Sequence, residues 1–93
     1  MAGSPAMTRA GNPTLAARPV ATLDAIGLKC PLPALKTRRA LARLKAGASL
    51  IVTADDPMAA IDIPHLVREL GEELLAAGEE DGALRFVIRR RLR

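Results

Sequence analysis

The sequence predicts an α/β (α+β) two-layer sandwich in the order β-α-β-α-β-β, with a four-stranded mixed sheet and two helices on one face. Three observations favour this fold class. Segments rich in β-branched residues alternate with helix-like segments, Gly and Pro separate them, and the last segment alternates apolar and polar side chains. An alternating strand needs only one buried face, so a single layer of helices is enough to cover the sheet.

The first three elements follow from local composition. Residues 20–27 contain Val and Thr and end at a glycine, which predicts a strand. Residues 31–46 are expected to form the first helix, with Gly47 ending it in the position just after the C-cap. Residues 48–54 are rich in β-branched side chains and form the clearest strand of the chain.

The second helix has two possible starts. Asp56 is a plausible N-cap with Pro57 at the first helical position, and Asp62-Ile63-Pro64 repeats this pattern one turn later, which allows the main body of the helix to begin there. Gly71 is expected to end the helix. A stripe of apolar side chains at helical spacing is expected to face the core: Ile63, Leu66, Val67 and Leu70.

The C-terminal segment predicts a β-hairpin. Asp81-Gly82 is a strong turn signal between two runs. Residues 84–89 alternate well, with Phe86 on the apolar face. Residues 72–80 have helical propensity, but pairing across the turn favours a strand.

The composition suggests one folded domain with an N-terminal leader. The 93 residues are 49% apolar and 26% charged, as in globular proteins. Residues 1–18 show no periodicity, which predicts a disordered leader before a domain of residues 19–93. The N-terminus lacks the apolar segment of a signal peptide, and no apolar run approaches the ~20 residues that span a bilayer. We therefore expect a cytoplasmic monomer that does not contact the membrane.

The single cysteine, Cys30, stands at the front of the first helix. If Cys30 is the N-cap, Pro31 and Pro33 occupy the first and third helical positions. The helix dipole and Lys29 then predict that the pKa of the thiol falls below its free value of ~8.5, although the prolines remove two N–H donors and so weaken the effect. The competing interpretation is that Cys30 is a small buried apolar residue.

Three motifs in order carry a family resemblance. They are Cys-Pro-Leu-Pro at 30–33, preceded by LDAIGLKCP from residue 23, then Asp-Asp-Pro at 55–57 and Asp-Ile-Pro at 62–64. Residues 22–90 resemble the TusA-like (SirA-like) sulfur carriers with the CPxP motif. Members of that family are similar in fold to the C-terminal domain of translation initiation factor three.

The resemblance implies a sulfurtransferase that works as a persulfide carrier. Cys30 would accept sulfur from a donor such as a cysteine desulfurase and relay it to an acceptor in tRNA thiolation, molybdenum cofactor metabolism or sulfur oxidation. Lys29, Pro31 and Pro33 would support the thiol. No cofactor is expected, and one His with one Cys does not make a structural zinc site.

A basic face is available for partner docking. A step of 100° per residue places Lys36, Arg39 and Arg43 opposite the apolar side of the first helix. These residues are expected either to contact an acidic patch on a donor or acceptor, or to form an ordinary solvated surface.

Two other functions compete with sulfur transfer. The net charge of +4 and the arginine-rich C-terminus suggest a nucleic-acid-binding module, but Phe86 is the one aromatic residue available for stacking on bases and is assigned to the core. A redox-regulatory protein could use Cys30 without transferring sulfur. His65 is expected to be a surface or cap residue rather than a base.

Overall fold

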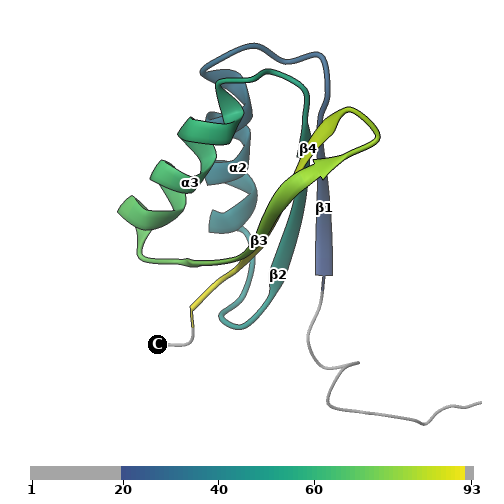
Figure 1. The fold of residues 1–93 in the computed structure, drawn as a ribbon. Coiled ribbons are helices and arrows are strands. Elements are labelled where there is room, and N and C mark those ends of the chain that lie inside the picture. Colours follow the sequence, from purple (N-terminus) through teal and green to yellow (C-terminus); the bar gives the residue numbers. More distant parts are fainter. Residues whose placement is uncertain (1–19, 92–93) are drawn as a thin grey trace, which may run out of the picture.

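The computed structural model describes residues 20–91, which form six elements in the predicted order. The expected leader at 1–18 lies outside the described residues. Figure 1 shows the elements in sequence: β1 (Val20–Ala25), α2 (Leu32–Ala42), β2 (Ser49–Ala54), α3 (Ala59–Leu70), β3 (Glu73–Glu80) and β4 (Ala83–Arg89). Among the described residues, no helix is long and apolar enough to cross a membrane.

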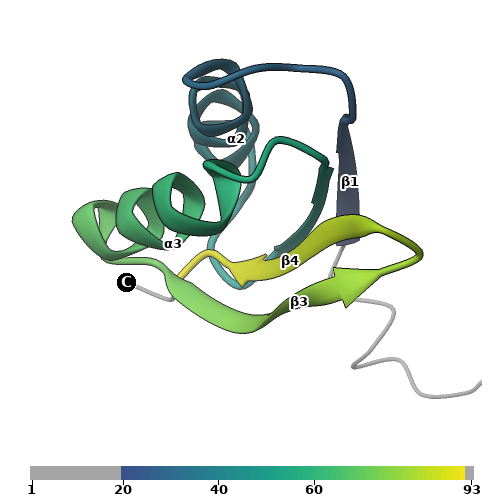
Figure 2. The same ribbon diagram turned by 45° about the horizontal axis from the view of Figure 1, so that its top comes forward.

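The four strands form one mixed sheet in the order β1-β2-β4-β3. β1 and β2 are parallel, and β4 pairs antiparallel with β2 and with β3. Both helices cover the same face of the sheet (Figures 1 and 2), as predicted. Because β1 and β2 are parallel neighbours, the loops that follow them emerge at the same edge of the sheet, and the candidate site lies there.

The C-terminal hairpin confirms the strand interpretation of residues 72–80. Asp81 and Gly82 have φ values of 52° and 81°, the left-handed conformations that a two-residue type I′ turn requires. β3 contains an irregularity between Leu74 and Ala76, and it forms an edge of the sheet with almost all of its side chains exposed. Pairing with β4 has therefore overridden the helical propensity of this segment.

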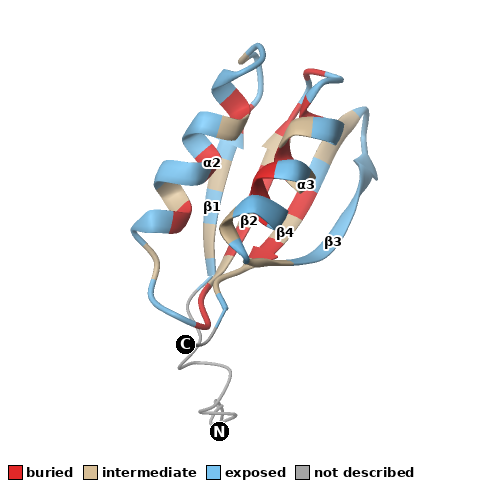
Figure 3. Cartoon of the chain, turned by 90° about the vertical axis from the view of Figure 1, so that its left-hand side faces the viewer, coloured by how far each residue is buried: buried red, intermediate tan, exposed pale blue. Residues whose placement is uncertain are grey.

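The core lies between the sheet and the helices. Figure 3 shows that the buried positions gather on β2, on β4 and on the sides of α2 and α3 that face them. The predicted stripe of α3 is confirmed, with Leu70 only half-buried. The largest fully buried apolar side chains are Phe86, Leu41, Leu50, Ile63, Ile88 and Val52.

The first helix is shorter than predicted. α2 ends at Ala42, and Gly47 belongs to the connection before β2. The reason is a long-range contact. Arg90 Nη1 donates to the carbonyl oxygens of Leu41 and Leu44, at 3.1 and 2.8 Å. A guanidinium at the C-terminus of a helix satisfies carbonyls that have no intrahelical partner, so the helix can end there.

The second helix begins earlier than the Asp62-Ile63-Pro64 motif allows. α3 starts at Ala59, and Pro64 lies inside it. Asp56 stabilises the turn that leads into α3. Its carboxylate accepts a hydrogen bond from Met58 N at 3.1 Å, and its carbonyl accepts one from Ala59 N at 2.9 Å. Asp56 thus caps the turn before the helix, whereas the N-cap itself is Met58. Gly71 ends the helix as predicted, with φ 74°.

Candidate functional site

Cys30 is exposed in the loop between β1 and α2. The N-cap of α2 is Pro31, so Cys30 precedes the N-cap and Pro33 is the second helical residue. The prediction that Cys30 itself caps the helix was wrong by one position. The alternative of a buried apolar cysteine was also wrong.

Two neighbouring aspartates connect the loop after β2 to the loop that carries Cys30. Asp55 Oδ1 accepts from Gly27 N at 2.9 Å, and Asp56 Oδ2 accepts from Cys30 N at 2.6 Å. Asp56 is 8% exposed, and its other oxygen binds Met58 N. The backbone of Cys30 is therefore fixed by a side chain that also starts the next helix.

A third aspartate contacts the sulfur directly. The Sγ atom of Cys30 donates to Asp62 Oδ2 at 3.0 Å, from the first turn of α3. This hydrogen bond raises the pKa of the Cys30 thiol, and partial loss of hydration and the negative charges of Asp62 and Asp56 act in the same direction. The prediction of a lowered pKa was wrong, because it left out the carboxylates of Asp62 and Asp56.

The thiol opens into a groove of ≈ 330 Å³ between α2 and α3. The groove has an apolar part and a polar rim that consists of Arg38, Asp62, His65 and Glu69. None of these four residues was predicted to be a site residue. His65 Nε2 and Glu69 Oε2 on the rim are 3.4 Å apart. The lining residues are Cys30, Pro31, Ala34, Leu35, Arg38, Asp62, His65, Leu66 and Glu69.

Comparison with known proteins decides the family. The family model described as "Sulfurtransferase TusA" matches residues 21–90. The chain belongs to the TusA (SirA-like) sulfur carrier family. This match extends from β1 to the end of β4 and includes both helices.

Individual TusA relatives support the same assignment. The "Putative sulfur carrier protein" of Archaeoglobus fulgidus is 46% identical over 68 residues, covering 72% of this chain and 88% of the relative. A protein of Neisseria meningitidis serogroup A with the same description is 45% identical over 67 residues, covering 72% and 90%. The crystal structure of a SirA-like protein from Desulfitobacterium hafniense matches with a TM-score of 0.70 at 27% identity, covering 77% of this chain and 99% of that one. The predicted fold is thereby confirmed.

The remaining residues predicted for the TusA site lie in different surroundings. Pro31 lines the groove, whereas Lys29 is exposed and is not among the lining residues. Pro33 is buried, and its carbonyl accepts from Thr37 Oγ1 at 2.8 Å, so it belongs to the core contact of α2. The three predicted docking residues are exposed, as expected, but they are not among the residues that line the groove: Lys36, Arg39 and Arg43.

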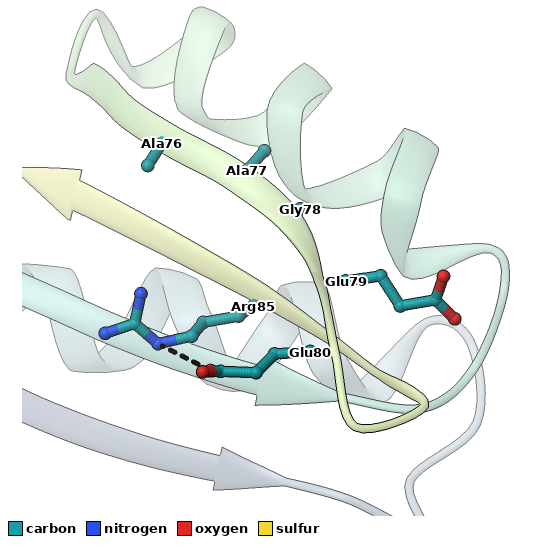
Figure 4. Close-up of a pocket in the computed structure, with 6 residues that line it drawn as sticks. All are labelled: Ala76, Ala77, Gly78, Glu79, Glu80 and Arg85. Carbon is teal, nitrogen blue, oxygen red and sulfur yellow. Dashed lines mark ion pairs between the residues drawn. The ribbon is translucent and has the colours of Figure 1, made fainter.

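A second hollow lies on the β3–β4 hairpin (Figure 4). Ala76, Ala77 and Gly78 leave this part of the hairpin uncovered, and the Glu80 and Arg85 side chains pair across it at 3.7 Å. None of its lining residues has a thiol, a hydroxyl or an imidazole group. The groove beside Cys30 is therefore the better candidate for a reaction site.

The Asp56 contacts predict an acid-sensitive loop. Hydrogen bonds from the N–H groups of Cys30 and Met58, together with the charge of Lys29, hold the pKa of Asp56 below its ordinary value. The stability that Asp56 contributes is therefore complete above the unfolded-state pKa of ~3.9 and is lost as pH falls through the lower folded-state pKa. In urea unfolding, Asp56→Asn should be less stable than wild type at neutral pH, and the difference should shrink in acid.

The matched control is Glu79→Gln, which removes an exposed carboxyl on β3. Its stability difference from wild type should stay small at both pH values. An Asp56→Asn protein as stable as wild type at neutral pH would contradict the role assigned to this carboxylate.

Proposed function

We propose that this chain carries sulfane sulfur as a persulfide on Cys30, accepting it from a donor such as a cysteine desulfurase and relaying it to an acceptor protein. The observation that carries the proposal is the position of the chain's one thiol. In a TusA-family fold, Cys30 is exposed at the mouth of a groove, and its backbone is fixed by Asp56. A carrier needs an accessible sulfur held in a defined position.

The loading step requires no cofactor. The Cys30 thiolate attacks the outer sulfur of the donor persulfide, a new S–S bond forms at Sγ, and the donor cysteine leaves as a thiolate. The proton of Cys30 passes to solvent before the attack, because the thiolate is the nucleophile in such exchanges. In the relay step, an acceptor thiolate attacks the outer sulfur, and Cys30 leaves as a thiolate.

We place the protein in the reducing cytoplasm, where a lone thiol stays free. We propose that it works as a monomer. Candidate destinations for the sulfur are tRNA thiolation, molybdenum cofactor metabolism and sulfur oxidation.

The relay can be tested with a bacterial cysteine desulfurase and sulfur-labelled cysteine. After loading, the desulfurase is removed and a second sulfur-relay protein with a free cysteine is added. Label should leave this chain and appear on the second protein. Label that enters the chain but does not leave would contradict the relay, and label that never enters would contradict the carrier function.

The basic face of α2 provides a separate prediction. Reversing Lys36, Arg39 and Arg43 to glutamate should slow loading by about ten-fold or more, because loss of steering lowers the association rate with an acidic partner surface. Wild-type loading should slow as salt rises, and the variant should respond less. Arg38→Glu, which alters the groove rim on the same helix, is the comparison. Equal rates and salt responses for the triple variant and wild type would make the face an ordinary solvated surface.

The nucleic-acid alternative loses its main support. Three of the C-terminal arginines pair with glutamates of the adjoining segment: Arg85 with Glu80, Arg89 with Glu73 and Arg90 with Glu72. Arg91 Nε donates to Gly71 O at 2.8 Å. Phe86 is 2% exposed and offers no surface for stacking on bases.

A further inference from the structure

The Asp62 carboxylate contacts the Cys30 sulfur, although the start of α3 does not require this contact. An aspartate in the first turn of a helix already interacts favourably with the helix dipole from any exposed orientation. Here the carboxylate instead reaches from α3 to the start of α2, where Oδ2 lies 3.0 Å from Cys30 Sγ. The contact brings together two residues that are 32 positions apart.

Charged or titratable groups lie near the thiol on every neighbouring element, namely Lys29, Arg38, Asp56, His65 and Glu69. Most of them are engaged elsewhere. Asp56 accepts hydrogen bonds from two backbone N–H groups, and the charge of Lys29 helps to lower the pKa of Asp56. His65 Nε2 lies 3.4 Å from Glu69 Oε2. Among the described residues, Asp62 is the one with a side-chain hydrogen bond to the sulfur.

We propose that Asp62 slows two reactions at Cys30. In the unloaded protein it slows the reaction of the thiol with small electrophiles, and in the loaded protein it slows removal of the sulfane sulfur by small thiols. The part that concerns the loaded protein rests on the proposed carrier function. The part that concerns the free thiol does not, and it can be tested on the chain alone.

In the unloaded protein, Asp62 favours the thiol over the thiolate. Ionisation breaks the S–H···O hydrogen bond and places two negative charges beside each other. The raised pKa of Cys30 agrees with this geometry. Since the thiolate is the reactive form, oxidants and alkylating agents should react slowly with Cys30.

In the loaded protein, the same carboxylate slows loss of the sulfur. A small thiolate that attacks the outer sulfur forms a new S–S bond and breaks the bond between that sulfur and Sγ. The electron pair of the broken bond stays on Cys30 Sγ, which later takes a proton from water, and the small thiol departs as a persulfide. A thiolate that is disfavoured by a neighbouring carboxylate is a poor leaving group, so this reaction is slow. A protein partner could relieve the effect by placing an N–H group or a cation against Asp62.

The test compares wild type with Asp62→Asn, which keeps the side-chain shape and removes the charge. The first readout is the pH profile of alkylation of Cys30 by iodoacetamide, and the second is the release of sulfur from polysulfide-loaded protein by glutathione. Lowering the pKa of a thiol by one unit raises its thiolate fraction about tenfold, and the weaker nucleophile reduces the gain in rate to about threefold. We therefore expect the pH profile of alkylation to move to lower pH in Asp62→Asn. The alkylation rate at neutral pH and the rate of sulfur release should each be about threefold or more above wild type.

Two further variants isolate the cause. Glu79→Gln removes an exposed carboxylate on β3 that is not among the residues lining the groove, so its profile should match wild type. Asp62→Glu keeps the charge and should stay closer to wild type than Asp62→Asn. An unchanged or slower alkylation rate and an unmoved pH profile in Asp62→Asn would overturn the proposal, as would an equal change in Glu79→Gln. Failure of wild type to load would instead overturn the carrier function, and the alkylation result would still decide the role of Asp62 at the free thiol.

Discussion

Replacing Cys30 with serine should abolish sulfur acceptance and leave the fold intact. Cys30 is the only cysteine of the chain, so no other residue can hold a persulfide. Its side chain is exposed, and the hydrogen bond from its backbone N–H to Asp56 does not involve the sulfur. Serine can also donate to Asp62. The measurements are labelled-sulfur transfer from a desulfurase and thermal unfolding followed by circular dichroism.

Cys30→Ser should show no label above background and a thermal midpoint equal to that of wild type. Ala34→Ser, which adds a hydroxyl to the same groove and keeps the thiol, is the control and should still accept label. Label retained on Cys30→Ser would contradict the assignment of the sulfur to this residue. A collapsed unfolding curve would show that Cys30 has a structural role.

Replacing Phe86 with alanine should produce the largest loss of stability. Phe86 is 2% exposed on the inner face of β4, where it lies opposite Val52 of β2. Truncation of a buried phenylalanine costs about 3–5 kcal/mol, because apolar contacts are lost and a cavity remains. A domain of this size has a total stability near the lower end of ~5–15 kcal/mol, so the variant should be unfolded in a substantial fraction of molecules. Urea unfolding measures the effect.

The matched control is Val87→Ala on the opposite face of the same strand. Val87 is only half-buried, so its truncation should cost about 1 kcal/mol or less. Equal losses for the two variants would contradict the placement of the core on one side of the sheet.

The strands and their order were predictable because their signals are local. Residues 48–54 are rich in β-branched side chains, and β2 begins one residue later than predicted, at Ser49. Asp81-Gly82 identified the hairpin, since few residue pairs accept left-handed conformations at both turn positions. The helix ends were not predictable in this way. α2 ends at Ala42, where Arg90 from the far end of the chain binds the carbonyls of its last turn and of the connection that follows.

The site shows the same division. The Cys-Pro-Leu-Pro motif pointed to Cys30 as a candidate residue and to the start of a helix from adjacent residues alone. The sign of the pKa shift depends on Asp62, whose carboxylate reaches the thiol only when α3 packs beside α2. Sequence reasoning recognised Asp56 and Asp62 as helix-start residues. That the Asp56 carboxylate also binds Cys30 N follows from the parallel pairing of β1 and β2, which brings the loops after these two strands together.

The central claim is that Cys30 holds sulfane sulfur, and intact-protein mass spectrometry tests it most directly. The full chain is incubated with a cysteine desulfurase and cysteine, its mass is measured, and a second sample is treated with a thiol reductant before measurement. We expect the intact mass to increase by one sulfur atom and the reductant to remove the added mass completely, and digestion should place the adduct on the peptide that contains Cys30. Two added oxygen atoms give nearly the same mass but form a sulfinic acid that such a reductant does not reverse. An adduct that survives the reductant, or no adduct under conditions in which the desulfurase itself carries a persulfide, would contradict the claim.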